Sequence, residues 1–129
     1  MKVLAFRFTD DVPRMQAFLA ALGLSADLAS ESGTYVQLDA AAGAAVLHSA
    51  AEADQPTPSG TTAMSFEADE LLEAVRDRLA AAGFADAVVV DESFGRSLRV
   101  TDPDGQQVQV NEAMTDLYGY RRAGTATTR

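Results

Sequence analysis

The stretch "RSLRVTDPDGQQVQVNE", residues 96–112, decides the fold. Apolar and polar residues alternate on both sides of the sequence "DPDG", and such a period of two indicates half-buried strands. Pro103 and Gly105 are typical of a tight turn, because proline presets one backbone angle and glycine accepts a positive φ. The stretch therefore predicts two neighbouring strands joined by a turn, with one apolar face and one polar face.

The same order of elements occurs twice along the chain. Helical spacing of apolar residues predicts helices in "DDVPRMQAFLAALGL", residues 10–24, and in "DELLEAVRDRLAAAGF", residues 69–84. One predicted strand precedes each helix and three follow it. The predicted strands are residues 2–9, 26–29, 34–39, 44–49, 61–68, 87–90, 97–101 and 107–111. Matching residues support a repeat, such as Val36 with Leu98 and Val46 with Val108, each pair 62 positions apart.

This order predicts an α+β fold of two βαβββ modules. We place the first module at residues 1–49, a linker at 50–60, the second module at 61–112 and a C-terminal segment with a mobile tail at 113–129, with residues 1–120 as one domain. One helix covers only one face of each curved sheet. The residues expected beneath the helices are Val36, Leu38, Leu98, Val100, Val108 and Val110.

The amino-acid composition narrows the classes of partner that the protein is expected to bind. A net charge of −9 argues against nucleic acid, which needs clustered basic residues. The chain has no cysteine, which excludes disulfides and thiolate chemistry. No apolar run is long enough to span a bilayer, and the first residues do not resemble a signal peptide. We therefore expect a cytoplasmic protein without a membrane partner.

The sheet faces opposite the helices hold the candidate site residues. Tyr35, Gln37, Gln109 and Asn111 offer a phenol and amides that orient a neutral polar ligand. Arg7 and Arg99 would bind an anionic group, or pair with Glu67 instead. The residues that we predict to bind ligand are Arg7, Tyr35, Gln37, Leu47, Phe94, Arg99, Gln109 and Asn111.

The two modules, together with "FRFTDDVPRMQAFLAALGL" and "FGRSLRVTDPDGQQVQVNE", resemble the vicinal oxygen chelate superfamily, which includes glyoxalase I and the bleomycin-resistance binding proteins. The resemblance implies metal ligands at Val3, Leu47, Thr61 and Gln109, and this set cannot hold a metal. A shift of one residue on the fourth strand would put His48 in place of Leu47. His48 and Gln109 would still be too few, so we predict no metal and no cofactor.

The resemblance implies two functions that the residues leave open. The first is a metal-free homodimeric protein that binds an aromatic or antibiotic-like natural product, for sequestration or resistance. Phe94 stands where resistance proteins of this superfamily often carry an aromatic residue. The alternative is an enzyme, such as a glyoxalase-like lyase or isomerase or a dioxygenase-like catalyst, with Glu67 or His48 as base. A third possibility is a module that serves only protein association.

Overall fold

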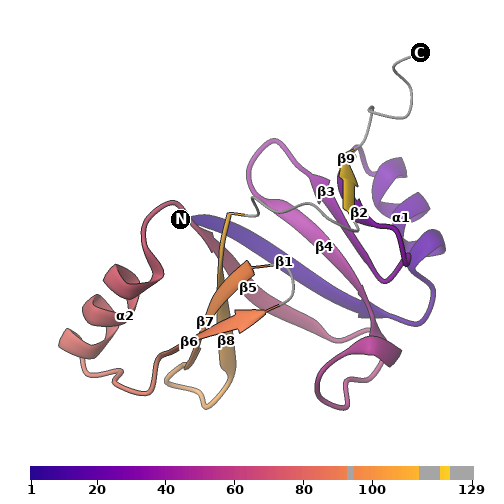
Figure 1. Ribbon diagram of the computed structural model, residues 1–129. Helices are drawn as coiled ribbons and strands as arrows, with labels where there is room; N and C mark the ends of the chain where they lie inside the picture. The colour runs from indigo at the N-terminus through magenta and orange to yellow at the C-terminus, as the bar shows by residue number, and fades with distance from the viewer. Residues whose placement is uncertain (93–94, 114–119, 123–129) are drawn as a thin grey trace. The chain divides into compact units, whose positions relative to one another are not determined.

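The computed structural model describes residues 1–92, 95–113 and 120–122 (Figure 1). The order of one strand, one helix and three strands occurs twice along the chain, which confirms the predicted α+β fold of two βαβββ modules. A 3-10 turn at Ala50–Glu52 and strand β9 were not predicted. The elements are β1 (Lys2–Thr9), α1 (Val12–Ala21), β2 (Ser25–Ser30), β3 (Tyr35–Asp39), β4 (Ala44–Ser49), β5 (Thr62–Ala68), α2 (Leu72–Ala81), β6 (Val88–Glu92), β7 (Gly95–Thr101), β8 (Gln107–Glu112) and β9 (Tyr120–Arg122).

The chain divides into two compact units. The first unit holds Leu4–Ala63 and the described residues of Tyr118–Arg129, and the second unit holds Met1–Val3 and the described residues of Met64–Leu117. In the first unit, β1 pairs in parallel with β4, and β4, β3, β2 and β9 follow as antiparallel neighbours. In the second unit, β5 pairs in parallel with β8, and β7 and β6 follow as antiparallel neighbours. Apart from β9, the strand order is thus the same in both units.

Local chemistry explains where the first helix begins. The Asp11 carboxylate accepts a hydrogen bond from the Arg14 amide at 3.1 Å and so caps α1, and Pro13 occupies the first turn. At the other end, Gly23 has φ +108° and its amide bonds the Ala20 carbonyl at 3.0 Å. The predicted start and end of this helix are therefore close to those observed.

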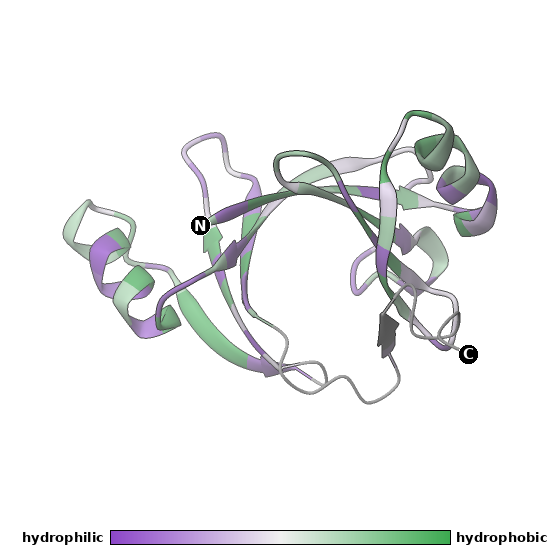
Figure 2. Ribbon diagram, turned by 90° about the horizontal axis from the view of Figure 1, so that it is seen from above, coloured by the Kyte–Doolittle hydropathy of each residue, from purple (hydrophilic) through white to green (hydrophobic). Residues whose placement is uncertain are grey.

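The cores lie beneath the two helices, each within its own unit. In the first unit, Val36 and Leu38 of β3 pack with Val12, Met15 and Leu19 of α1. The second unit repeats this arrangement, with Leu98, Val100 and Val110 packed with Leu72 and Val75 of α2. Both helices carry hydrophobic and hydrophilic residues, as their mixed colours in Figure 2 show. Every residue that we predicted beneath a helix lies there.

A cavity of about 340 Å³ lies in the second unit on the α2 side of its sheet. Its wall is almost wholly apolar and includes Phe66, Val75, Leu79 and Phe84, with Arg78 contributing a charged group. The Arg78 guanidinium is held by both Glu70 carboxylate oxygens, at 3.0 and 2.7 Å. α2 therefore leaves part of the apolar sheet face uncovered at this place.

The turn predicted from "DPDG" is present between β7 and β8. The Gly105 amide bonds the Asp102 carbonyl at 2.9 Å, and Gly105 has φ +84°, which side chains other than glycine rarely adopt. The Asp102 carboxylate also accepts hydrogen bonds from the amides of Asp104 and Gln106, both at 2.9 Å. Side-chain and backbone bonds thus fix the same turn.

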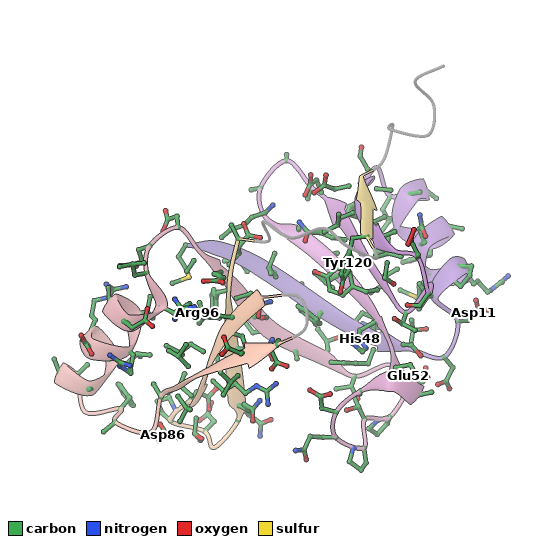
Figure 3. All side chains as sticks on the ribbon, viewed as in Figure 1. Asp11, His48, Glu52, Asp86, Arg96 and Tyr120 are labelled. Carbon is green, nitrogen blue, oxygen red and sulfur yellow. The ribbon has the colours of Figure 1, made fainter. Side chains whose placement is uncertain are left out.

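Arg96 joins α2 to the sheet of the second unit. Its guanidinium contacts the Glu73 carboxylate of α2 at 2.5 and 3.1 Å and the Glu112 carboxylate of β8 at 3.3 Å (Figure 3). The hydrogen bonds from Arg96 lower the pKa of Glu73 to about 2 and raise the pKa of Arg96.

Among the described residues, neither helix is long and apolar enough to cross a membrane.

Candidate functional site

In the first unit, aromatic rings gather on the sheet face opposite α1. We call this surface the aromatic face and define it as Phe6, Phe8, Tyr35, His48 and Tyr120. Neighbouring ring centres lie 5.3 Å apart for Phe8 and His48, 6.1 Å for Phe6 and Phe8, 6.4 Å for Phe6 and Tyr35, and 5.7 Å for Tyr35 and Tyr120. These spacings are those of interacting aromatic pairs. The five rings therefore form one continuous row.

The register of the paired strands shows on which sheet face this row of rings lies. His48 of β4 lies opposite Phe8 of β1 on one side and opposite Tyr35 of β3 on the other, and residues opposite each other share a sheet face. On the same face, buried Leu4, Ala44 and Val46 form a small core against which Phe6 and Tyr35 pack. All five ring residues are half-buried. The half-buried rings thus adjoin a buried apolar cluster on the same sheet face.

Polar groups accompany the rings. The Tyr35 hydroxyl donates to the Gln37 side-chain oxygen at 3.5 Å, and Gln37 itself is buried. Burial raises the pKa of the Tyr120 phenol above its ordinary value, so this group stays protonated at neutral pH. The His48 Nδ1 atom lies 2.9 Å from the Ser49 carbonyl oxygen. Tyr35 and Gln37 lie opposite His48 and Val46 on β4, on the face away from α1, as predicted.

The predicted position of Leu47 is wrong. Leu47 is completely buried in the core beneath α1, whereas His48 lies on the aromatic face. The error comes from the sequence repeat, which matches Val46 with Val108. In the structure, Val46 faces away from α1, whereas Val108 faces α2. Val108 packs beneath α2, so its counterpart in the first unit is Leu47. Both Val46 and Leu47 are fully buried, so alternation alone could not decide the register.

Arg7 also lies on the other side from the one predicted. It is opposite Leu47 and therefore shares the sheet side of α1, where its side chain is exposed and its Nε donates to the Thr62 hydroxyl at 2.8 Å. Phe6 and Phe8 take the face that we had given to Arg7. Val3 and Ala5 of β1 are apolar as well, so alternation alone could not decide which face of β1 meets the helix.

The second unit carries a polar face opposite α2. It brings together three residues that we had predicted, Arg99, Gln109 and Asn111, and adds Ser65, Glu67, Glu92 and Ser97. The Ser65 hydroxyl donates to the Gln109 carbonyl at 2.7 Å, and the Gln109 amide donates to the Asn111 side-chain oxygen at 2.8 Å. Much of the hydrogen-bonding capacity of this face is thus used within the unit.

Arg99 pairs with Glu92, whereas the sequence had suggested Glu67 as its partner. Its guanidinium donates to the Glu92 carboxylate, which also lies 3.5 Å from the hydroxyl of fully buried Ser97. Glu67 lies opposite Asn111 on the neighbouring strand. Arg99 therefore faces the predicted side of the sheet, but a carboxylate of the chain already balances its charge.

The residues for metal chemistry do not come together in the described part of the chain. No group of three or more His, Cys, Asp or Glu side chains there is arranged to hold a metal ion. Of the two fallback ligands, His48 belongs to the first unit and Gln109 to the second. Phe94, the remaining residue that we predicted to bind ligand, lies outside the described residues.

Comparisons with known proteins identify the fold. No protein-family model matches the chain, and no curated protein matches it by sequence. Its structure resembles that of a protein described as an NAD-dependent benzaldehyde dehydrogenase from Legionella pneumophila, with a TM-score of 0.63 and 12% identity over 85% of this chain and 97% of that one. It also resembles a glyoxalase/bleomycin resistance protein/dioxygenase superfamily member from Vibrio splendidus 12B01, with a TM-score of 0.58 and 18% identity over 87% and 98%. The chain therefore has the fold of that superfamily, as its motifs predicted.

Proposed function

We propose that this chain is a small-molecule-binding protein whose aromatic face holds a planar aromatic ligand. The observation that carries the proposal is the continuous row of half-buried rings beside a buried apolar cluster on the same sheet face. Flat ligands gain from offset or edge-on contact with such rings, by about 1 kcal/mol beyond the burial of their apolar area. Sequestration of an antibiotic-like natural product by a homodimer is the more specific form of this proposal.

A test of the ligand class uses a panel of planar aromatic natural products with saturated ring analogues as controls. We expect planar compounds to raise the melting temperature and their saturated analogues to leave it unchanged. Phe8→Leu removes one ring and keeps an apolar side chain, so it should weaken binding by about 2- to 10-fold. Phe18→Leu is the matched control, because Phe18 is 57% exposed on α1, on the other side of the same sheet. Equal effects of the two variants would contradict the proposal.

Metal content separates this proposal from a metal-dependent enzyme of the same fold. The protein, purified without chelator, would be analysed for bound metal and heated with added Ni²⁺, Zn²⁺, Mn²⁺ or Fe²⁺. A binder without metal should contain no stoichiometric metal and show no metal-specific stabilisation. Binding of an ion to the folded state raises stability by mass action, so a shift of several degrees with one metal would favour the enzyme.

A further inference from the structure

His48 is the most distinctive group on the aromatic face. It is the only histidine of the chain and lies on β4 (Figure 3), opposite Phe8 of β1 on one side and Tyr35 of β3 on the other. The remaining rings are hydrocarbon or phenol, which stack on a ligand or donate a hydroxyl proton. An imidazole ring adds a nitrogen that accepts a hydrogen bond when the ring is neutral. His48 can therefore distinguish ligands that are alike in shape.

The backbone fixes which nitrogen of His48 accepts. The Nδ1 atom lies 2.9 Å from the carbonyl oxygen of Ser49. A carbonyl oxygen only accepts hydrogen bonds, so Nδ1 must carry the proton in this contact. In the neutral ring the lone pair is then on Nε2, the nitrogen farther from the strand backbone. The contact with the Ser49 carbonyl thus leaves Nε2 of neutral His48 as a hydrogen-bond acceptor.

The Nε2 atom is available to a ligand. Within residues 1–92, 95–113 and 120–122, no hydrogen bond engages it. The His48 side chain is half-buried, so part of it is open to solvent. The ring of Phe8 lies beside the His48 ring, with ring centres 5.3 Å apart and planes inclined by 50°. A ligand that stacks along the row of rings can therefore direct a polar substituent toward Nε2.

We propose that His48 makes the aromatic face selective for hydroxylated aromatic ligands, with the phenolic hydroxyl donating to Nε2. This inference rests on the proposed function, because the ring of the ligand must first lie against the aromatic face. The acceptor distinguishes a phenol from its methyl ether, which has nearly the same shape but no proton to donate. A site built to bond a hydroxyl discriminates against an analogue without one, since its polar group is left unpaired.

The probes are 2-naphthol, 2-methoxynaphthalene and naphthalene, titrated into ¹⁵N-labelled protein at a pH where His48 is neutral. Because His48 is the only histidine, its ring nitrogen signals are identified without assignment variants. We expect the free protein to show protonated Nδ1 and unprotonated Nε2. 2-Naphthol should move the Nε2 signal and bind about 3- to 10-fold more tightly than 2-methoxynaphthalene.

Two variants test whether His48 causes the preference. His48→Phe keeps a ring but removes the acceptor, so it should bind 2-naphthol and 2-methoxynaphthalene with equal affinity. His48→Gln keeps an acceptor oxygen and should retain part of the preference. Urea unfolding of each variant establishes that it is folded.

The results separate the two proposals. If all three probes bind the aromatic face with equal affinity, or if the free protein carries the proton on Nε2, the role of His48 is refuted and the aromatic binding face stands. If none of the probes shifts the amide signals of Phe6, Phe8 or Tyr35, the binding face itself is refuted, and the role of His48 with it.

Discussion

Leu47 and His48 are neighbours in the chain but face opposite sides of the sheet, so alanine at each position should have very different effects. Leu47 is completely buried beneath α1. Leu47→Ala removes three carbon atoms, worth about 0.8 kcal/mol each, and leaves a cavity that raises the loss to about 3 kcal/mol. His48 is half-buried, and its side chain makes one hydrogen bond and a ring contact with Phe8. His48→Ala should cost about 1 kcal/mol.

The free energy of unfolding of each variant is obtained from urea denaturation followed by circular dichroism, with a common slope for all proteins. The expected difference of about 2 kcal/mol corresponds to roughly a 30-fold difference in the unfolding equilibrium. It also corresponds to a melting temperature several degrees lower for Leu47→Ala than for His48→Ala. Equal losses, or a larger loss for His48→Ala, would refute the register of β4 and with it the composition of the aromatic face.

Three further predictions concern stability in the second unit. Because the pKa of Glu73 in the folded state, about 2, lies below its ordinary value of 4.5, its ionised form stabilises the protein above pH 4.5, and this contribution is lost as the pH falls through 2. Urea unfolding of Arg96→Gln should therefore depend less on pH over that window than unfolding of the unmodified protein. Gly105→Ala should cost about 1–2 kcal/mol in the same assay, because alanine is strained at a φ of +84°. Asp102→Ala removes the acceptor of two amide hydrogen bonds and should cost about 1–2 kcal/mol, and no measurable loss would mean that the turn is held by its backbone alone.

Local patterns predicted most of the fold because their physical causes are local. The turn at residues 102–105 depends on side chains within it, and the first helix begins at a capping Asp11. In the second unit, alternation of apolar and polar residues placed Arg99 and Gln109 on the correct sheet face. There, only one face of β7 and β8 is apolar, so the sequence pattern has a single interpretation.

The aromatic face could not be predicted in the same way. β1 and β4 of the first unit carry apolar residues on both faces, so periodicity shows that they are strands but not which side meets the helix. The acid that pairs with Arg99 was missed for a related reason. Glu92 lies on β6, and its approach to Arg99 depends on strand pairing rather than on sequence spacing. Tyr120 joins the row through β9, a strand of three residues that gives no periodic signal.

The pairing of β9 with β2 has a consequence for the order of events during synthesis. Tyr120 of β9 lies opposite Ser30 of β2, and almost the whole second unit is translated between these two residues. While the ribosome is still adding β5 to β8, the β2 edge of the first unit has exposed backbone groups that other chains can join. Ser30 and its neighbours are thus a place where a chain without β9 is open to aggregation, and the pairing of β9 with β2 covers that edge.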